Sequence, residues 1–515
     1  MKAGKRRCLA ALGVSLALTV TACHPKPTQP LPDPSPTPTQ SLPDTPPTPT
    51  PRPTVFTLPL DPQGTWNPYL GSYSANMILI PLLYDSLYQL DGHFQPEALL
   101  AQGFEVSEDG LTWRVTLKSG VTFSNGETLD APRVCAALNA ARSEKSLYAQ
   151  RLKNVQRIAP DGENMVVFQL NEENRDFLSL LDVPIALVAG DEVYGTGRYV
   201  LEGERLLARE DGWREILAIP REIKLTAVSA ADEMIAAFDS GTLGLVISDP
   251  TGADALGFSG SYQTWEYPTT TMLYLGFQRS SGVCQDPALR AALSRAVDRT
   301  ALVNGVLGGH ASLAALPVPP TSARYDKGLA QRLSYDPLAA ENALDTMGYE
   351  VGEDGVRQLG KRPLALTLLI NSDNLFKEKL GAAIAAELEA VGAQVTVTAL
   401  PWEGYKTALA GGNFDLYLGE TRLTGDFDLT GFFTADSGLC YGGAPDKELA
   451  AAHTAARTSG AWRDFYQQYI QNPPFVTLCF KTGSVLTQWG QVSGLGPTQG
   501  DLFYQLENWV FREQN

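Results

Sequence analysis

Polar and aromatic side chains follow three predicted strands between Leu364 and Phe433, and their types suit the binding of a small polar molecule. Glu420 and Arg422 bring opposite charges to one edge, where they could pair with a zwitterionic ligand or with each other. Arginine also offers a planar fork that matches a carboxylate, a geometry that lysine lacks. The candidates at this edge are Asn371, Ser372, Trp402, Tyr405, Glu420, Arg422 and Asp426.

The elements between these residues place them together. The apolar run 364–370 predicts a buried strand, and a helix follows in which apolar residues recur every four positions up to Gly392. The alternating stretch 394–400 predicts a second strand, a short helix ends at Gly411 and Gly412, and 414–419 predicts a third strand. Strands that alternate with helices form a parallel sheet, and ligands bind outside the carboxyl ends of such strands. We therefore expect a crevice at this edge.

The amino terminus predicts export and attachment to a membrane. Four basic residues precede an uncharged stretch at 9–20, which is too short to span a bilayer and is typical of a signal peptide. Residues 20–23 resemble a bacterial lipobox, so we expect cleavage after residue 22 and acylation of Cys23. An ordinary signal peptide with a chance cysteine is the alternative.

The segment that follows predicts a tether. Thirteen of the 35 prolines lie between His24 and Thr54, among threonine and serine, and no apolar periodicity is present. Such a composition favours extended polyproline II and cannot build a core. At roughly 3.1 Å per residue it would reach up to about 95 Å from a membrane. An unselected flexible linker is the alternative.

Composition limits the remaining possibilities. A chain of 515 residues exceeds one hydrophobic core, so we expect two or three domains. The net charge of −17 argues against a nucleic-acid partner. The four histidines are scattered, and the chain has no GxSxG or P-loop motif, so we expect no metal, no cofactor and no catalytic residue. After Cys8 and Cys23, the remaining cysteines could form disulfides or stay as buried thiols; they are Cys135, Cys284, Cys440 and Cys479.

Several blocks resemble one known family. These are LYDSL at 83–87, the stretch 92–134 with a predicted hairpin and helix, GTGRYVL at 195–201, LYLGFQ at 273–278, the predicted helix 286–303 and YDPLAAENALDTMGY at 335–349. In this order they resemble the extracellular solute-binding proteins, family 5, of peptide and nickel ABC importers. The resemblance runs from about residue 54 to 510. In the helix 286–303 we expect Arg290 and Arg299 on the exposed side.

The resemblance implies an α/β, bilobal fold of the periplasmic-binding-protein type II kind, in which two mixed-sheet lobes close on a ligand about a hinge. It implies a monomer that delivers ligand to the transmembrane subunits of an ABC permease. The implied parts are a signal peptide at 1–22, a tether at 23–54, lobe I at 55–276 and 482–515 with an inserted subdomain near 80–191, and lobe II at 277–481.

The resemblance also assigns roles within the site. Members that bind peptides hold the ligand's amino terminus with an aspartate, and Asp426 matches it best, with Phe427 as its aromatic neighbour. We expect Tyr73, Trp402 and Tyr405 to lie in the cleft because their loops face it. The leading function is capture of a peptide or similar small polar solute for import. The alternatives are a lipoprotein that senses ligand or contacts a partner without a transporter, and an enzyme on the same scaffold.

Overall fold

The computed structural model describes residues 56–70, 75–214, 220–253, 255–434, 437–443 and 445–512. Residues 52–515 form one compact unit, which contains everything that follows. The expected signal peptide, the lipid site Cys23, the tether and Tyr73 lie outside the described residues.

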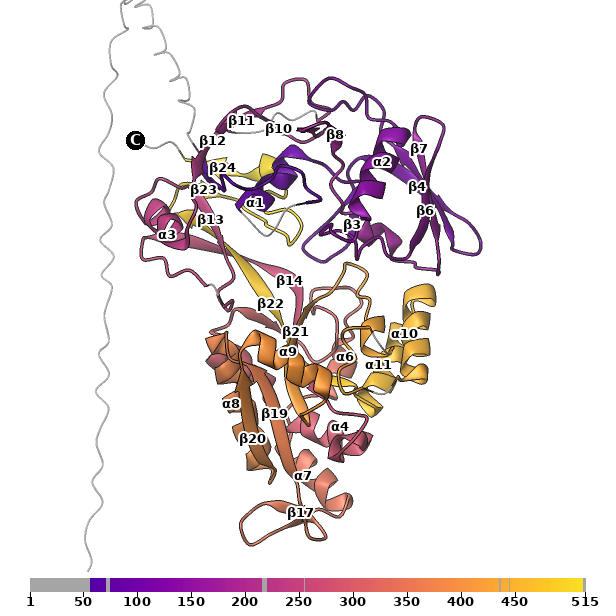
Figure 1. Cartoon of the computed structure of the whole chain (residues 1–515), viewed down its shortest axis with the longest axis vertical. Helices are drawn as coiled ribbons and strands as arrows, with labels where there is room; N and C mark the ends of the chain where they lie inside the picture. The colour runs from indigo at the N-terminus through magenta and orange to yellow at the C-terminus, as the bar shows by residue number, and fades with distance from the viewer. Residues whose placement is uncertain are drawn as a thin grey trace, which may run out of the picture. The chain divides into compact units, whose positions relative to one another are not determined.

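Two long antiparallel strands connect the parts of this unit. Strands β14 (Tyr262–Phe277) and β22 (Phe475–Gln488) pair along most of their length, and they run side by side in Figure 1. Their ladder is interrupted between Pro268 and Met272, where proline lacks the N–H that a continuous ladder needs. The sheet they belong to has the order β13-β22-β14-β21-β19-β20, with β15 paired to β22.

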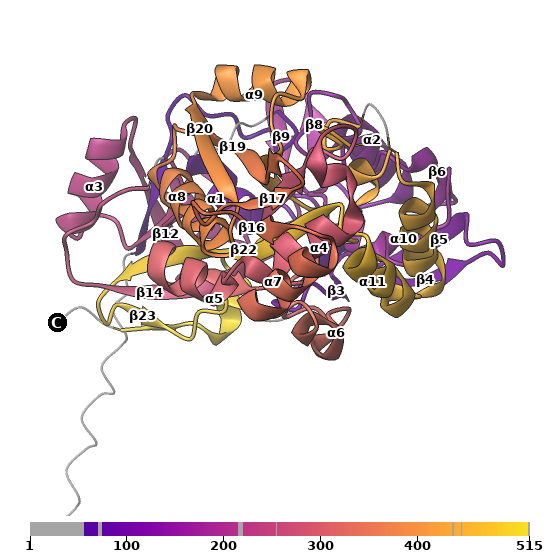
Figure 2. The same cartoon turned by 90° about the horizontal axis from the view of Figure 1, so that it is seen from below.

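The predicted parallel unit is confirmed. Strands β19 (Ala365–Asn371) and β20 (Gln394–Leu400) pair in parallel over their whole length, and β19 pairs in parallel with β21 (Leu416–Arg422). Helices α8 (Leu375–Ala390) and α9 (Trp402–Gly411) connect them and lie on opposite sides of β19 and β20 in Figure 2. The carboxyl ends of the three strands therefore meet at one edge.

The part before β14 carries smaller sheets. The expected hairpin is present as β4 (Ala101–Val106) and β5 (Thr112–Leu117), in a sheet of order β4-β5-β7-β6. A second sheet has the order β1-β12-β11-β10. The remaining strands of these two sheets are β1 (Phe56–Leu60), β6 (Val155–Asp161), β7 (Met165–Leu170), β10 (Tyr199–Leu201), β11 (Arg205–Ala208) and β12 (Glu222–Ala227).

The remaining elements flank these sheets. The other helices are α1 (Ala75–Leu83), α2 (Ala131–Ala141), α3 (Ala231–Asp239), α4 (Pro287–Ala296), α5 (Arg299–Ala301), α6 (Lys327–Gln331), α7 (Pro337–Thr346), α10 (Lys447–Ser459) and α11 (Trp462–Gln471). The other strands are β2 (Tyr88–Leu90), β3 (Pro96–Ala98), β8 (Leu187–Ala189), β9 (Glu192–Tyr194), β13 (Leu245–Ser248), β15 (Ala311–Leu313), β16 (Glu350–Val351), β17 (Arg357–Leu359), β18 (Arg362–Pro363), β23 (Val492–Ser493) and β24 (Val510–Phe511).

The apolar cores divide along β14 and β22. One core contains buried residues from 56–245 and 485–509, whereas two others contain buried residues from 272–480. We call the parts around these cores lobe I and lobe II. Phe94 is the exception, because it comes from lobe I and is buried in a lobe II core. The lobe boundaries given above remain a prediction.

The expected exposure of Arg290 and Arg299 is wrong. The predicted helix 286–303 ends at Ala296, and both arginines are buried, with 3% and 5% of their surface exposed. Arg290 donates to the carbonyl oxygen of Pro473 at 2.8 Å, and Arg299 donates to that of Thr477 at 2.7 Å. The periodic pattern shows which face of the helix is apolar. The opposite face is buried as well, because distant segments pack against it and their carbonyl oxygens accept from the arginines.

The described cysteines Cys135, Cys284, Cys440 and Cys479 are free thiols, which settles the alternative that the sequence left open. Within the described ranges, no group of three or more metal-ligating side chains is present. No helix there is both long enough and apolar enough to cross a bilayer.

Candidate functional site

The carboxyl edge of the parallel strands lies at the boundary between the lobes. Asn374 caps α8 by accepting from the backbone N–H of Phe376 and Lys377, and its Nδ2 donates to the carbonyl oxygen of Thr251 in lobe I at 2.9 Å. Asn371, at the end of β19, is 7% exposed and its Oδ1 accepts from the backbone N–H of Asp373 at 2.6 Å. These two asparagines therefore shape the edge, and one of them also connects the lobes.

Glu420 is held by lysines. Its carboxylate lies 2.9 Å from Lys377 Nζ and 3.5 Å from Lys481 Nζ, and Lys481 also lies 2.5 Å from Asp249 of lobe I. Burial opposes ionisation of Glu420, but the two lysines outweigh it and lower the pKa of this carboxyl. The negative charge of Glu420 is therefore balanced within the protein.

Arg422 ends β21 and its side chain is exposed. It stands opposite Thr271 in the register of β14. Burial raises the pKa of Tyr267 to about 12, and the positive charge of Arg422 acts in the other direction. The backbone of Arg422 thus lies beside the segment of β14 where the ladder between the long strands is interrupted.

The two aromatic residues of α9 differ in role. Tyr405 is 4% exposed, and its hydroxyl donates to the carbonyl oxygen of Leu418 at 2.8 Å, so it belongs to the core. Trp402 stacks on Tyr405 with ring centroids 5.9 Å apart and leaves 49% of its surface exposed. Trp402 is therefore about half exposed at the edge, and Lys406 Nζ lies over its ring, 5.5 Å from the centroid.

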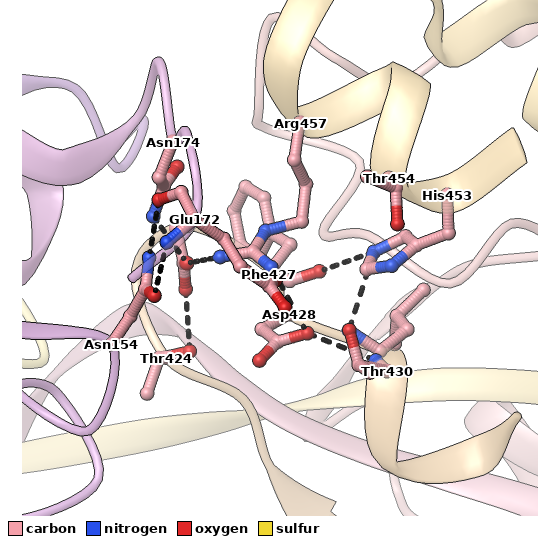
Figure 3. Close-up of polar contacts among 12 residues, drawn as sticks. Asn154, Glu172, Asn174, Thr424, Phe427, Asp428, Thr430, His453, Thr454 and Arg457 are labelled. Carbon is pink, nitrogen blue, oxygen red and sulfur yellow. Dashed lines mark hydrogen bonds and ion pairs between the residues drawn. The ribbon is translucent and has the colours of Figure 1, made fainter. Parts of the chain in front are cut away.

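Asp426 lies in a buried polar network between the lobes, and Figure 3 labels its partners Asn174, Thr424 and Arg457. It is 1% exposed, and its Oδ2 accepts from Arg457 Nη2 at 2.7 Å and from Asn174 Nδ2 at 3.0 Å. Its Oδ1 accepts from Thr424 Oγ1 at 2.6 Å. Arg457 and Thr424 belong to lobe II, whereas Asn174 belongs to lobe I. A ligand amine at this carboxylate would have to compete with these three protein donors.

Asp428 extends the same network. Its carboxylate lies 2.8 Å from Lys153 of lobe I and 3.5 Å from Arg457. Burial would raise the pKa of Asp428, but Arg457 and Lys153 outweigh it and hold that pKa well below its usual range. The carboxylate stays ionised because both cations are close.

His453 fixes the loop that carries these acids. The residue is 1% exposed, and its Nε2 accepts from the backbone N–H of Leu429 at 3.3 Å. The same nitrogen lies 3.3 Å from the carbonyl oxygen of Phe427. Burial lowers the pKa of His453 to about 4, so the ring is neutral near pH 7. A neutral ring can accept the Leu429 hydrogen bond, which an imidazolium cannot.

Sequence reasoning missed the partners of these acids. Lys377 and Lys481 reach Glu420 from α8 and β22, while Asn174 and Arg457 reach Asp426 from positions 252 and 31 residues away. One signal was available, because two acids at Asp426 and Asp428, beside apolar residues, imply a buried cation. Nothing in the pattern said which cation.

A cavity of about 480 Å³ lies elsewhere, between the loop at 91–93, strand β14 and the segment 495–504. Its lining contains none of the predicted site residues. It includes Trp265, Glu266 and Tyr504.

Known proteins share this sequence pattern and fold. Protein XP55 of Streptomyces lividans is 28% identical over 381 residues, which cover 68% of this chain and 67% of the relative. The nickel-binding periplasmic protein of Escherichia coli (strain K12) is 24% identical over 476 residues, covering 82% and 88% of the two chains. The structure of the oligopeptide-binding protein AppA from Bacillus subtilis, in complex with a nonapeptide, superposes with a TM-score of 0.60 at 18% identity. That superposition covers 89% of this chain and 98% of AppA.

A family model gives the assignment. The model of the bacterial extracellular solute-binding proteins, family 5 Middle, matches residues 95–438, which is more than half of the chain. Proteins of this family bind solutes outside the cytoplasm for ABC importers and are not enzymes. The chain belongs to the bacterial extracellular solute-binding proteins of family 5.

Proposed function

We propose that this protein is anchored to the outer face of the cell membrane through an acylated Cys23 and captures a peptide or a similar small polar solute between its lobes. It then delivers the solute to the transmembrane subunits of an ABC permease. The family and the relatives support the importer role, and the relatives' names cover both peptides and nickel. The lipobox-like residues 20–23 support the anchor.

The observation that carries the ligand proposal is the chemistry of the strand edge. Trp402 is about half exposed, and Arg422 is an exposed residue at the end of β21. Both stand at the carboxyl ends of a parallel sheet, on the side where Asn374 contacts lobe I. An indole face suits apolar or planar ligand groups, and the guanidinium suits a carboxylate.

Charge selection is therefore assigned to Arg422 rather than to Asp426 or Glu420. The carboxylates of both acids already accept from protein donors, as described above. Replacing such a donor by a ligand ammonium exchanges one charged contact for another and yields little net free energy.

Calorimetry with short peptides tests this proposal. Di- to pentapeptides of varied sequence are compared as free acids and as carboxyl-terminal amides, with peptides acetylated at the amino terminus as a third set. We expect the amides to bind at least tenfold more weakly and acetylation to matter less. Equal affinity of acids and amides would remove Arg422 from the site.

Native mass spectrometry of the freshly purified protein identifies the solute class independently. A bound peptide supports the proposal, whereas a nickel chelate or a sugar in the absence of peptide would contradict it. A solute that binds but is taken up equally well by cells lacking this protein would favour the sensor alternative.

A further inference from the structure

The inserted part of lobe I contacts lobe II through several hydrogen bonds and an ion pair. In addition to the bond from Asn174 to Asp426, the backbone N–H of Arg175 donates to the carbonyl oxygen of Arg457 at 3.1 Å. The side chain of Arg175 donates to the carbonyl oxygen of Ser459 at 2.9 Å, and Asp176 forms an ion pair with Arg324. Arg175 thereby caps α10, whose carboxyl-terminal carbonyls favour a cation. We call residues 174–176 and their lobe II partners the clasp.

The loop that carries the clasp is held in place by lobe I itself. The side chain of Asn154 donates to the carbonyl oxygen of Glu172 at 2.8 Å and accepts from the backbone N–H of the same residue at 3.1 Å (Figure 3). Asn174 Oδ1 also accepts from the backbone N–H of Asp176 at 3.0 Å. Because the loop is shaped from within lobe I, its donors are already oriented when the lobes meet.

The contact is tight and dry. Asn174 has no exposed surface, although its side chain reaches into the other lobe. A Cβ added to Gly425 would lie 2.6 Å from the carbonyl oxygen of Ser179 and 2.9 Å from Leu90 Cδ1, both in lobe I. Real Cβ atoms essentially never show contacts this short, so glycine at 425 allows the lobes to approach.

Two strained residues meet at the same contact. Phe94 of lobe I has a φ of 61° and Phe427 of lobe II has a φ of 53°, in the left-handed region that bulky residues avoid. Their rings lie edge to face, 5.9 Å apart, and both are buried. Such backbone strain persists where surrounding contacts over-determine it. Here Phe94 and Phe427 pack against each other across the lobe boundary.

We propose that the clasp holds the two lobes together in the absence of ligand. Residues that never touch the solute thereby set part of the protein's affinity for that solute. The network supplies interlobe bonds that in an open form would be replaced by water. The apparent affinity for a ligand falls with the fraction of protein that is not in the closed, binding-competent state. A protein that is already closed without ligand therefore binds with more of its intrinsic affinity. The clasp depends on the two-lobed fold and not on the identity of the solute.

Hydrogen exchange of the ligand-free full-length protein tests the clasp. The amide of Arg175 is a direct reporter, because its hydrogen-bond acceptor lies in the other lobe. In the wild type we expect this amide to be protected. Gly425→Ala blocks the approach of the lobes, and Asn174→Ala removes a donor to a buried carboxylate. Each should raise the exchange rate at Arg175. For Asn174→Ala we expect about ten- to a hundredfold, the effect of losing a hydrogen bond to a charged group.

Gly404→Ala is the matched control, since the added Cβ meets only Leu400 at 3.6 Å within lobe II. It should leave the rate at Arg175 unchanged. Protection within β19 shows that each variant is folded, and if Gly425→Ala loses that protection, Asn174→Ala decides the test. An unprotected Arg175 amide in the wild type overturns the proposal, and so does an unchanged rate in the folded variants. Because no solute is added, this experiment tests the clasp even if the proposed ligand is wrong.

Discussion

Replacing Arg457 by methionine should destabilise lobe II strongly. The side chain of Arg457 is 11% exposed and that of Asp426 is 2% exposed, and the guanidinium also approaches Asp428 at 3.5 Å. Methionine keeps much of the length but removes the charge, which leaves two buried carboxylates short of their common cation. Removing one partner of a buried ion pair costs about 3–5 kcal/mol.

Scanning calorimetry of the ligand-free protein measures this cost. For a unit of 150–250 residues, 1 kcal/mol corresponds to roughly 2–4 °C, so we expect the melting temperature of lobe II to fall by about 6–20 °C at pH 7. Arg463→Met on the neighbouring helix α11 is the matched control, because Arg463 is 68% exposed in its pair with Asp326 at 2.9 Å. An exposed pair contributes about 0–1 kcal/mol.

The pH dependence checks the mechanism. Asp428 has its pKa held below the unfolded value, so its contribution to stability is present above about pH 4 and is lost as the pH falls through the folded pKa. Without Arg457 this contribution shrinks, so the difference between wild type and variant should narrow below about pH 4. A loss at pH 7 as small as that of Arg463→Met, or a difference independent of pH, would refute the reasoning.

Three further predictions concern Cys23, Arg422 and His453. Cys23→Ala should release the protein into the medium or leave it unprocessed, and membrane fractionation that finds it cleaved yet still bound would rule out the lipid anchor. Arg422→Met should weaken a carboxylate-bearing ligand by about ten- to a hundredfold in calorimetry while the melting temperature stays within about 2 °C, since the side chain is exposed; unchanged affinity would contradict the assignment. His453, with its pKa lowered to about 4, favours the neutral form in the folded state, so it stabilises above about pH 6.5, and up to about 3 kcal/mol is lost as the pH falls toward 4. We therefore expect the free energy of unfolding, measured by denaturant titration between pH 4 and 7, to change less with pH in His453→Gln than in the wild type. An equal pH dependence in the two proteins would be the contrary result.

Local pattern sufficed for the parallel unit. The apolar run before Asn371, the four-residue spacing of α8 and the alternation in β20 each depend on residues close in sequence, and β19, β20 and β21 formed as expected. The shared edge followed, because parallel strands joined by helices end at the same side. The sequence therefore placed Asn371, Trp402 and Arg422 at one edge without any structure.

The partners of the charged residues depended on the tertiary structure. Glu420 lay two residues from Arg422, yet its carboxylate pairs with Lys377 and Lys481, which arrive from other elements. Asp426 pairs with Arg457, and its remaining donors include Asn174, which lies 252 residues away in sequence.

The physical reason is the range of the interactions. Periodicity reports which side of an element is buried, and this is a property of neighbours along the chain. An ion pair depends on which long side chains the packed elements bring within a few ångströms, and many cations of an acidic surface satisfy the same local pattern. The sequence by itself therefore determined the family, the sheet and the edge, whereas only the packing of lobe I against lobe II decided that Asp426 belongs to a buried contact between them.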